Sequence, residues 1–330
     1  MDSYDVVIVG AGPAGLNCAK GLSGKKVLVL EKNSELGPKV CAGGLTGEGL
    51  EQLKMPGSLM DRSFRKLTVH TSQGKNVIRL DSSFSLFTID RKRLGQWQLK
   101  KLGKNVTVRT GAMVTGIGKD FVTVNGSEKI CYKSLVAADG SSSLVRRHLK
   151  LPSKGLGIAV QYVIPGERKD LEIFFNAKLF GAWYAWIFPH RGYVSVGCGC
   201  DPKALLPERL RRNFHSWLRQ KGIDYSAGRF ESHPINFDFR GFRFGNVFLA
   251  GDAAGFASGL TGEGIYQALI SGEEIAKMIL NPKYRPVRLE KLIAEKREED
   301  KIVKRLNATL RKRGPVPEIE QELLGLFESG

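Results

Sequence analysis

Two patterns of hydrophobic positions run along the chain, and they predict two kinds of sheet. Four short runs are apolar at nearly every position, which is typical of parallel strands buried on both faces. These runs are 4–9, 26–30, 135–138 and 246–249. In other segments apolar and polar residues alternate, which predicts antiparallel strands. These segments are 66–70, 77–80, 158–163 and 171–175.

Helical patterns separate or follow these strands, and the order of the elements predicts a discontinuous first domain. Helices are expected up to Leu22, over 89–102, up to Lys277 and within 281–330. The alternating segments interrupt the part with the fully apolar strands. We therefore predict three parts: a nucleotide-binding domain of 1–62, 84–150 and 235–280, an antiparallel-sheet substrate domain of 63–83 and 151–234, and a C-terminal helical segment of 281–330.

The first apolar strand leads directly into a glycine-rich turn, Gly10-Ala11-Gly12-Pro13-Ala14-Gly15, and the second ends in Glu31. Strand, glycines, helix, strand and acid in this order predict a Rossmann-type dinucleotide site. Gly10 makes the tight turn, Gly12 lets the backbone approach a pyrophosphate, and Gly15 lets the helix pack on the strand. The helix N-terminus attracts the phosphates, and Glu31 accepts hydrogen bonds from ribose hydroxyls.

Two further segments favour FAD as the dinucleotide. Pro13 within GxGPAG, followed by a strand that ends in Glu, resembles flavoproteins more than dehydrogenases. Asp139-Gly140 begins the DGxxSxxR pattern of flavin hydroxylases, which continues to Arg146. Gly251-Asp252 follows the fourth apolar strand. In flavoproteins of this kind the second Asp binds the ribityl chain of FAD.

One pentapeptide, Leu-Thr-Gly-Glu-Gly, occurs at 45–49 and again at 260–264. A glycine-rich loop that feeds a helix can hold negative charge, so the second copy is placed to stabilise reduced FAD near Gly262 and Gly264. The first copy follows 41–44, where glycines permit close backbone approach to the flavin ring. We expect one flat ring to be held by two loops of small residues, although coincidence between glycine-rich segments is an alternative.

These motifs, together with Lys39–Gly44 and the sequence Tyr184-Ala185-Trp186-Ile187-Phe188-Pro189, resemble the geranylgeranyl reductase family. The resemblance covers about residues 1–280 and implies the para-hydroxybenzoate hydroxylase-like α/β fold. In that fold a Rossmann-type FAD-binding domain with a mostly parallel sheet carries an inserted antiparallel-sheet substrate domain. The chain departs from the family pattern at Ser195, where Asn is usual, and at Gly259, where Pro is usual. It is also shorter than usual archaeal members, which puts the lipid tunnel in doubt.

The resemblance also implies the site residues. Those for FAD, beyond the glycine turn and Glu31, are Lys32, Cys41, Ala42, Gly43, Arg91, Val114, Asp139, Gly140, Gly251, Asp252, Gly262, Gly264 and Ile265. Those for substrate are Tyr184, Trp186, Phe188 and Gly259, and those for catalysis are Cys41, Tyr184 and Trp186. Strand alternation puts the three aromatic residues on one face.

Cys41 is either a protic group at the ring or a small apolar filler. Trp183 is either core or wall, and His190 is most simply a turn residue.

The implied activity is hydride transfer from flavin N5 to C=C bonds of a prenyl chain on a lipid or diphosphate. Aromatic faces could stabilise the developing cation by about 0.5–2 kcal/mol per ring. The alternatives are an FAD-dependent monooxygenase of an aromatic ring or quinone, a halogenase, and a non-catalytic flavin sensor. With no second glycine-rich nucleotide unit, the electron donor is either transiently bound NAD(P)H or a ferredoxin.

Net charge and cysteine content bear on the partners and the cellular location of the protein. The chain of 330 residues has 51 Lys and Arg against 33 Asp and Glu, a net charge of +18. This surplus suits a prenyl diphosphate or an anionic membrane surface, and the scattered basic residues argue against nucleic acid. Five dispersed cysteines and no spanning or secretory segment predict a cytoplasmic protein, with peripheral attachment to the inner face of the membrane as a further option. No metal-ligand spacing is found.

Overall fold

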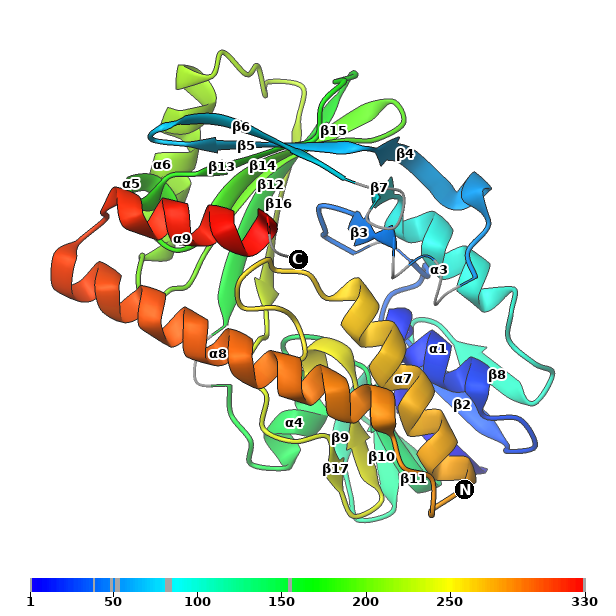
Figure 1. The fold of residues 1–330 in the computed structure, drawn as a ribbon. Coiled ribbons are helices and arrows are strands. Elements are labelled where there is room, and N and C mark those ends of the chain that lie inside the picture. The colour runs from blue at the N-terminus through cyan, green and yellow to red at the C-terminus, as the bar shows by residue number, and fades with distance from the viewer. Residues whose placement is uncertain are drawn as a thin grey trace.

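The computed structural model describes residues 2–37, 39–47, 50, 54–80, 85–153 and 156–328. Within these residues the chain forms a first sheet of eight strands, a second sheet of seven and a small sheet of three. Figure 1 shows the first sheet with its helices in the lower part of the view and the second sheet above it. The long helix α8 (Val287–Arg313) runs along one side of both.

The first sheet has the strand order β17-β18-β11-β1-β2-β8, with β10 and β9 attached beside β11. The strands are β1 (Asp2–Val9), β2 (Val27–Leu30), β8 (Val106–Arg109), β9 (Val114–Ile117), β10 (Phe121–Val124), β11 (Glu128–Ala137), β17 (Arg243–Phe244) and β18 (Val247–Leu249). β18, β11, β1, β2 and β8 pair in parallel. Val7 of β1 packs into one buried core and Val6 into another. The runs are apolar throughout because both faces of the sheet are covered, which confirms the predicted fold class.

Helices α1 (Pro13–Gly21) and α7 (Ile265–Leu280) pack together on one face of the first sheet. α3 (Arg91–Leu99) lies beside α1, and α4 (Leu144–His148) follows β11. The prediction of one helix over 89–102 was too long. Asp90 ends strand β7 (Leu86–Ile89) and caps α3, because its Oδ1 accepts a hydrogen bond from the Arg93 N–H at 2.8 Å.

The second sheet has the order β16-β12-β15-β14-β13-β5-β6. Its strands are β5 (Lys66–Thr71), β6 (Gly74–Arg79), β12 (Gly157–Pro165), β13 (Glu172–Phe175), β14 (Tyr184–Pro189), β15 (Tyr193–Cys200) and β16 (Arg229–Ile235). β13 and β5 pair in parallel, so the sheet is mixed where an antiparallel sheet was predicted. The reason is that β5 and β13 come from segments far apart in sequence, and no hairpin joins them.

One face of the second sheet is covered by α5 (Ala177–Phe180) and α6 (Pro207–Gln220). The other face looks toward the first sheet and packs against α8 and α9 (Pro317–Glu328). The predicted division into domains remains a prediction, and its boundary at 83–84 lies outside the described residues.

The small sheet lies between the two large ones and has the order β3-β7-β4. Its strands are β3 (Gly44–Thr46) and β4 (Met60–Phe64), with β7 between them, and the short helix η1 (Gly57–Leu59) precedes β4. A second short helix, η2 (Gly251–Ala253), follows β18. None of the helices in the described part of the chain is both long and apolar enough to traverse a bilayer.

Candidate functional site

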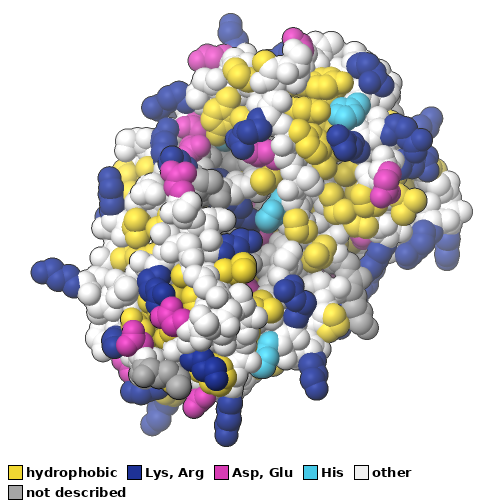
Figure 2. Space-filling view, turned by 180° about the vertical axis from the view of Figure 1, so that it is seen from behind, with side chains coloured by type: hydrophobic (Ala, Val, Ile, Leu, Met, Phe, Trp, Pro, Cys, Tyr) yellow, Lys and Arg dark blue, Asp and Glu magenta, His cyan; other side chains and the backbone are white. Residues whose placement is uncertain are grey.

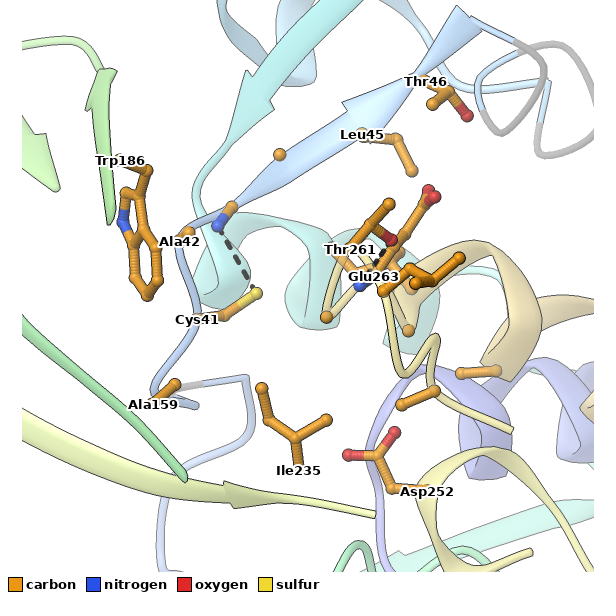
Figure 3. Close-up of a pocket in the computed structure, with 18 of the residues that line it drawn as sticks. Cys41, Ala42, Leu45, Thr46, Ala159, Trp186, Ile235, Asp252, Thr261 and Glu263 are labelled. Carbon is orange, nitrogen blue, oxygen red and sulfur yellow. Dashed lines mark hydrogen bonds between the residues drawn. The ribbon is translucent and has the colours of Figure 1, made fainter. Parts of the chain in front are cut away.

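A cavity of about 670 Å³ opens between the first and second sheets. Its walls come from the glycine turn before α1, from 39–46, from β14 and from 257–265. The C-terminal helices α8 and α9 close another side through Glu295, Ile302, Leu323 and Leu326. Figure 3 shows Leu45 and Thr46 of the first pentapeptide near Thr261 and Glu263 of the second, with Trp186 across the cavity.

The three glycines of the first turn have different reasons to be glycine. A Cβ on Gly10 would lie 2.3 Å from the Ala138 carbonyl oxygen, and one on Gly15 would lie 2.0 Å from the Gly10 carbonyl oxygen. Both positions are therefore required by backbone packing. Gly12 has no described atom within 4 Å of its Cβ position, and it lines the cavity at the N-cap of α1. The free N–H groups of the helix start are thus approachable by a phosphate.

Pro13 and Ala14, in the first turn of α1, also line the cavity. Glu31 does not, because its carboxylate holds the turn instead. Oε2 accepts a hydrogen bond from the Ala11 N–H and Oε1 from the Asn33 N–H, both at 2.9 Å.

Lys32 and Val114 also lie outside the cavity lining. Val114 is buried in the core under the first sheet. The cofactor contacts expected of Glu31, Lys32 and Val114 therefore stay predictions.

Asp139 binds the first N–H groups of α4, whose N-cap residue is Ser143, and does not line the cavity. Its Oδ2 accepts hydrogen bonds from the Leu144 N–H at 2.7 Å and from the Val145 N–H at 3.4 Å. Burial raises its pKa, and Oδ1 has no hydrogen-bond partner among the described residues. The next residue, Gly140, does line the cavity. The DG motif thus fixes a helix start and places a glycine at the wall.

Asp252 lines the cavity, as does its neighbour Gly251. The Asp252 carboxylate accepts hydrogen bonds from Lys39 Nζ at 3.0 Å and from Ser141 Oγ at 3.2 Å. Burial acts most strongly and raises the pKa of Asp252, but the charge of Lys39 and the hydrogen bonds from Lys39 and Ser141 together outweigh it, so the pKa lies below its ordinary value. Asp252 is therefore an ionised acceptor at the predicted ribityl position.

Two buried nitrogens at the same end of the cavity are unsatisfied. Arg91 Nε and His233 Nε2 have no hydrogen-bond partner among the described residues, and both side chains line the cavity. Burial, followed by the nearby charge of Lys39, lowers the pKa of His233 to about 4. An orphaned guanidinium N–H beside an open helix start fits the anionic pyrophosphate of FAD.

The loop of 41–44 is held by hydrogen bonds to its carbonyl groups. Cys41 O accepts from Gln161 Nε2 at 3.4 Å, and Ala42 O lies 2.9 Å from His190 Nε2. The Gly43 N–H donates to Cys41 Sγ at 3.3 Å, as the dashed line in Figure 3 shows. Cys41, Ala42 and Gly43 all line the cavity.

Gly43 is a glycine for a reason that needs no cofactor. Its φ is +77°, and a Cβ there would lie 2.6 Å from His190 Cε1 and 2.7 Å from the Ile89 carbonyl oxygen. The expectation that this glycine admits the flavin ring remains a prediction, because packing alone explains the residue.

The second loop, residues 258–264, is held mainly by hydrogen bonds of Ser258. Its Oγ accepts hydrogen bonds from the N–H groups of Leu260 at 3.2 Å and Thr261 at 3.0 Å, and donates to Glu299 Oε1 of α8 at 3.0 Å. The Tyr184 hydroxyl donates to the Thr261 carbonyl oxygen.

Gly262, Gly264 and Ile265 line the cavity, and the flavin contacts expected of them remain predictions. Gly259 does not, because it packs against Phe237 and Val303, and its substrate role stays a prediction.

The described residues of the two pentapeptides have different backbones, although Leu45 and Thr46 of the first and residues of the second border the cavity. Leu45 and Thr46 belong to β3 and pair with β7. Leu260 and Thr261 form a turn, and Gly262 has a φ of +67°. Glu48 and Gly49, the last two residues of the first copy, lie outside the described residues. The same residues therefore adopt different conformations in the two places. Pairing with β7 sets the conformation of Leu45 and Thr46, and the hydrogen bonds of Ser258 set that of Leu260 and Thr261.

The aromatic residues of β14 face the cavity together. Tyr184, Trp186 and Phe188 lie on one face, with neighbouring ring centroids 6.2 and 6.3 Å apart. Burial raises the pKa of the Tyr184 hydroxyl, which already donates to the second loop. Trp183 is buried against Phe237 and also lines the cavity, so it is both core and wall.

Ser195, which departs from the family pattern, links Trp186 to the first loop. Trp186 Nε1 donates to Ser195 Oγ at 3.0 Å, and Ser195 Oγ donates to Gln161 Oε1 at 2.9 Å. Gln161 in turn donates to Cys41 O. The short Ser side chain therefore leaves room for Gln161 in this buried chain of hydrogen bonds.

With this geometry in place, the family can be stated. The model of the family described as "FAD binding domain" matches residues 3–277. The chain belongs to this FAD-binding domain family.

Individual relatives agree with the earlier resemblance. The chain is 29% identical over 310 residues to digeranylgeranylglycerophospholipid reductase of Methanocaldococcus jannaschii, covering 84% of this chain and 78% of that protein. It is 27% identical over 297 residues to geranylgeranyl diphosphate reductase of Rhodobacter capsulatus, covering 83% and 74%. The resemblance to geranylgeranyl reductases is thereby confirmed, and the chain is an FAD-dependent oxidoreductase.

A solved structure shares the fold. The geranylgeranyl bacteriochlorophyll reductase-like protein of Thermoplasma acidophilum superposes with a TM-score of 0.75 at 20% sequence identity. The superposition covers 100% of this chain and 84% of that one. At this identity the likeness shows the fold alone.

Four residues of this FAD-binding domain site were not found from the sequence. Lys39, Gln161, His233 and Glu299 reach the cavity or its loops from separate elements. Lys39 stands at the start of the 39–44 motif but had no predicted role. Nothing in the local sequence marks the other three, because each acquires its place through a long-range contact. His190 lies at the expected turn, but its side chain is 1% exposed, so the reading as a simple turn residue was incomplete.

Proposed function

We propose that the protein reduces C=C bonds of a prenyl chain carried by a lipid or a diphosphate. One observation carries the proposal: the same cavity is lined by the residues predicted to hold FAD and by an apolar part. That part is lined by Leu67, Leu86, Phe87, Ile173, Leu260, Ile302, Leu323 and Leu326, together with the three aromatic residues of β14. A long hydrocarbon chain is the ligand that suits such walls.

The C-terminal helices contribute to this apolar part. Ile302 of α8 and both Leu323 and Leu326 of α9 line the cavity. The C-terminal helices thus form part of the wall that we assign to a chain-like substrate.

The residues have distinct roles in the proposed reaction. FAD, when bound and reduced, supplies a hydride to one carbon of the double bond. Cys41 holds a proton at Sγ for the other carbon. Trp186 and Phe188 present aromatic faces that stabilise developing positive charge and exclude water. Tyr184 positions the second loop through Thr261.

The test is anaerobic turnover of the reduced, FAD-loaded protein with geranylgeranyl diphosphate and with a geranylgeranylated glycerolipid, followed by mass spectrometry. We expect a gain of about 2 mass units per reduced bond. C41S is expected to slow turnover by about 10²-fold or more, as loss of a general acid does. C131S is the matched control, because Cys131 lies outside the cavity lining. Product formed only with O₂ present would favour the monooxygenase alternative, and no turnover of either kind would favour a flavin sensor.

Two accessory features belong to the proposal. The electron donor is NAD(P)H bound transiently or a ferredoxin, and anaerobic flavin bleaching with each donor distinguishes them.

The basic surface supports weak attraction to an anionic membrane or to the diphosphate group. Figure 2 shows Lys and Arg spread over the back of the molecule, with Asp and Glu among them, rather than gathered into one block. Flotation with anionic and neutral vesicles tests the membrane attraction and the cytoplasmic, peripheral placement.

A further inference from the structure

Behind the first loop lies a buried charged group that the proposed function does not use. His190 is 1% exposed and Asp61 is 9% exposed. His190 Nδ1 lies 2.9 Å from Asp61 Oδ2, and Arg93 Nη1 donates to Asp61 Oδ1 at 2.8 Å. Arg93 is itself fixed, because its Nη2 donates to the carbonyl oxygens of Ser58 and Leu59 at 2.9 Å each.

The hydrogen bonds of His190 define its protonation. Nδ1 faces a carboxylate oxygen and Nε2 faces the Ala42 carbonyl oxygen, both of which only accept. A neutral imidazole has one donor and would leave a lone pair facing an oxygen, whereas the imidazolium donates to both. Both contacts of His190 are thus of the kind that an imidazolium makes, and the ring stacks on Tyr193 with centroids 4.3 Å apart.

The charge of His190 reaches Cys41 through one peptide group. His190 donates to the carbonyl of Ala42, and the N–H of the same peptide, on Gly43, donates to Cys41 Sγ at 3.3 Å. A cationic donor on the carbonyl polarises the peptide, so its N–H becomes a stronger donor. A stronger donor favours negative charge on the sulfur.

We propose that His190, held by Asp61 and Arg93, is the positioning residue that fixes and polarises the Ala42–Gly43 peptide so that it stabilises the thiolate form of Cys41. The importance of this hydrogen-bonded arrangement for catalysis rests on the proposed function, in which Cys41 gives up a proton. The device itself is independent of the substrate.

The test is the pH profile of Cys41 alkylation by iodoacetamide in the full chain, with and without FAD, read at the peptide level so that Cys131 is scored separately. No prenyl substrate or reductant is present, so failure of this inference and failure of the proposed function are distinguishable. Other ionisable groups close to His190 or Cys41 are the same in both His190 variants. They are Asp61, Asp90, Arg93, Tyr184, Tyr193 and Glu263.

H190F keeps a ring for Tyr193 but has no donor. We expect its Cys41 alkylation near pH 7 to fall about tenfold, equal to a displacement of the profile by about one pH unit. H190Q can still donate one uncharged bond, so a smaller fall of about threefold is expected. H215Q is the matched control on the far side of the second sheet, and its profile should equal that of the wild type.

Superimposable profiles for H190F and wild type would overturn the proposal. FAD content and the unfolding midpoint show whether a variant is folded. If H190F does not fold, H190Q and the isosteric D61N decide, and wild-type profiles for both would likewise overturn it.

Discussion

The first glycine-rich loop leads into one copy of the pentapeptide and the second contains the other copy, and the protein holds the two loops by different means. The first, 41–46, is fixed from behind by charged and polar side chains of other elements, above all His190 and Gln161. The second, 258–264, is fixed mostly from within by Ser258, and from outside by Tyr184 and Glu299. The first loop is therefore packed tightly on its rear side, whereas the second is more open.

The difference teaches that a glycine must be judged by what lies beside it. A Cβ on Gly43 would meet a His ring and a backbone carbonyl, both within 2.7 Å. A Cβ on Gly262 would come no closer to a described atom than 3.6 Å, from Ile235 Cδ1. Both residues have positive φ, so the comparison separates steric packing from backbone strain.

The largest expected effect comes from this pair of glycines. G43A should lower the free energy of unfolding by about 3 kcal/mol or more, because strain at positive φ adds to a backbone clash. G262A, its matched control, should cost only about 1–2 kcal/mol, from strain alone. Chemical denaturation with FAD content as a second readout measures both. Equal losses in the two variants would remove the distinction between the loops.

Loss of the Tyr184 hydroxyl should have an intermediate effect on the second loop. Y184F removes the donor to the Thr261 carbonyl, which we expect to cost about 1–2 kcal/mol of unfolding free energy. Y225F, on the opposite face of the second sheet, is the control and should be near neutral. If the unfolding free energies of Y184F and Y225F were equal, the Tyr184 hydroxyl would not help to hold the second loop.

The smallest expected effect is a pH dependence at Glu299. Burial raises its pKa, with Lys296 and Ser258 opposing the shift. A carboxyl whose folded pKa is raised contributes stability that is complete below the unfolded pKa of about 4.5 and is lost as pH rises through the folded pKa. E299Q should therefore reduce the loss of stability on going from pH 4.5 to 7. Thermal unfolding of both proteins at several pH values checks this, and parallel pH curves would contradict it.

Much of the fold could be predicted from the sequence because its signals are local. The apolar runs that include β1, β2 and β11 indicated a parallel sheet covered on both faces, and the alternation in β14 placed Tyr184, Trp186 and Phe188 on one face. The helix over 89–102 was predicted too long, because a single side-chain cap, Asp90, decides where it begins. The parallel pairing of β5 with β13 joins distant segments, and no local pattern encodes it.

For the site, the sequence by itself determined the glycine turn, the DG and GD motifs and the aromatic strand, and with them the FAD-binding family. These are short motifs whose backbone requirements are written in consecutive residues. Only the tertiary structure decided that His190 and Asp61 stand behind Ala42, that Lys39 meets Asp252, and that α8 holds Ser258. Such contacts join residues from separate elements, and a buried charge or hydrogen bond exists only once folding has brought its partners together and excluded water.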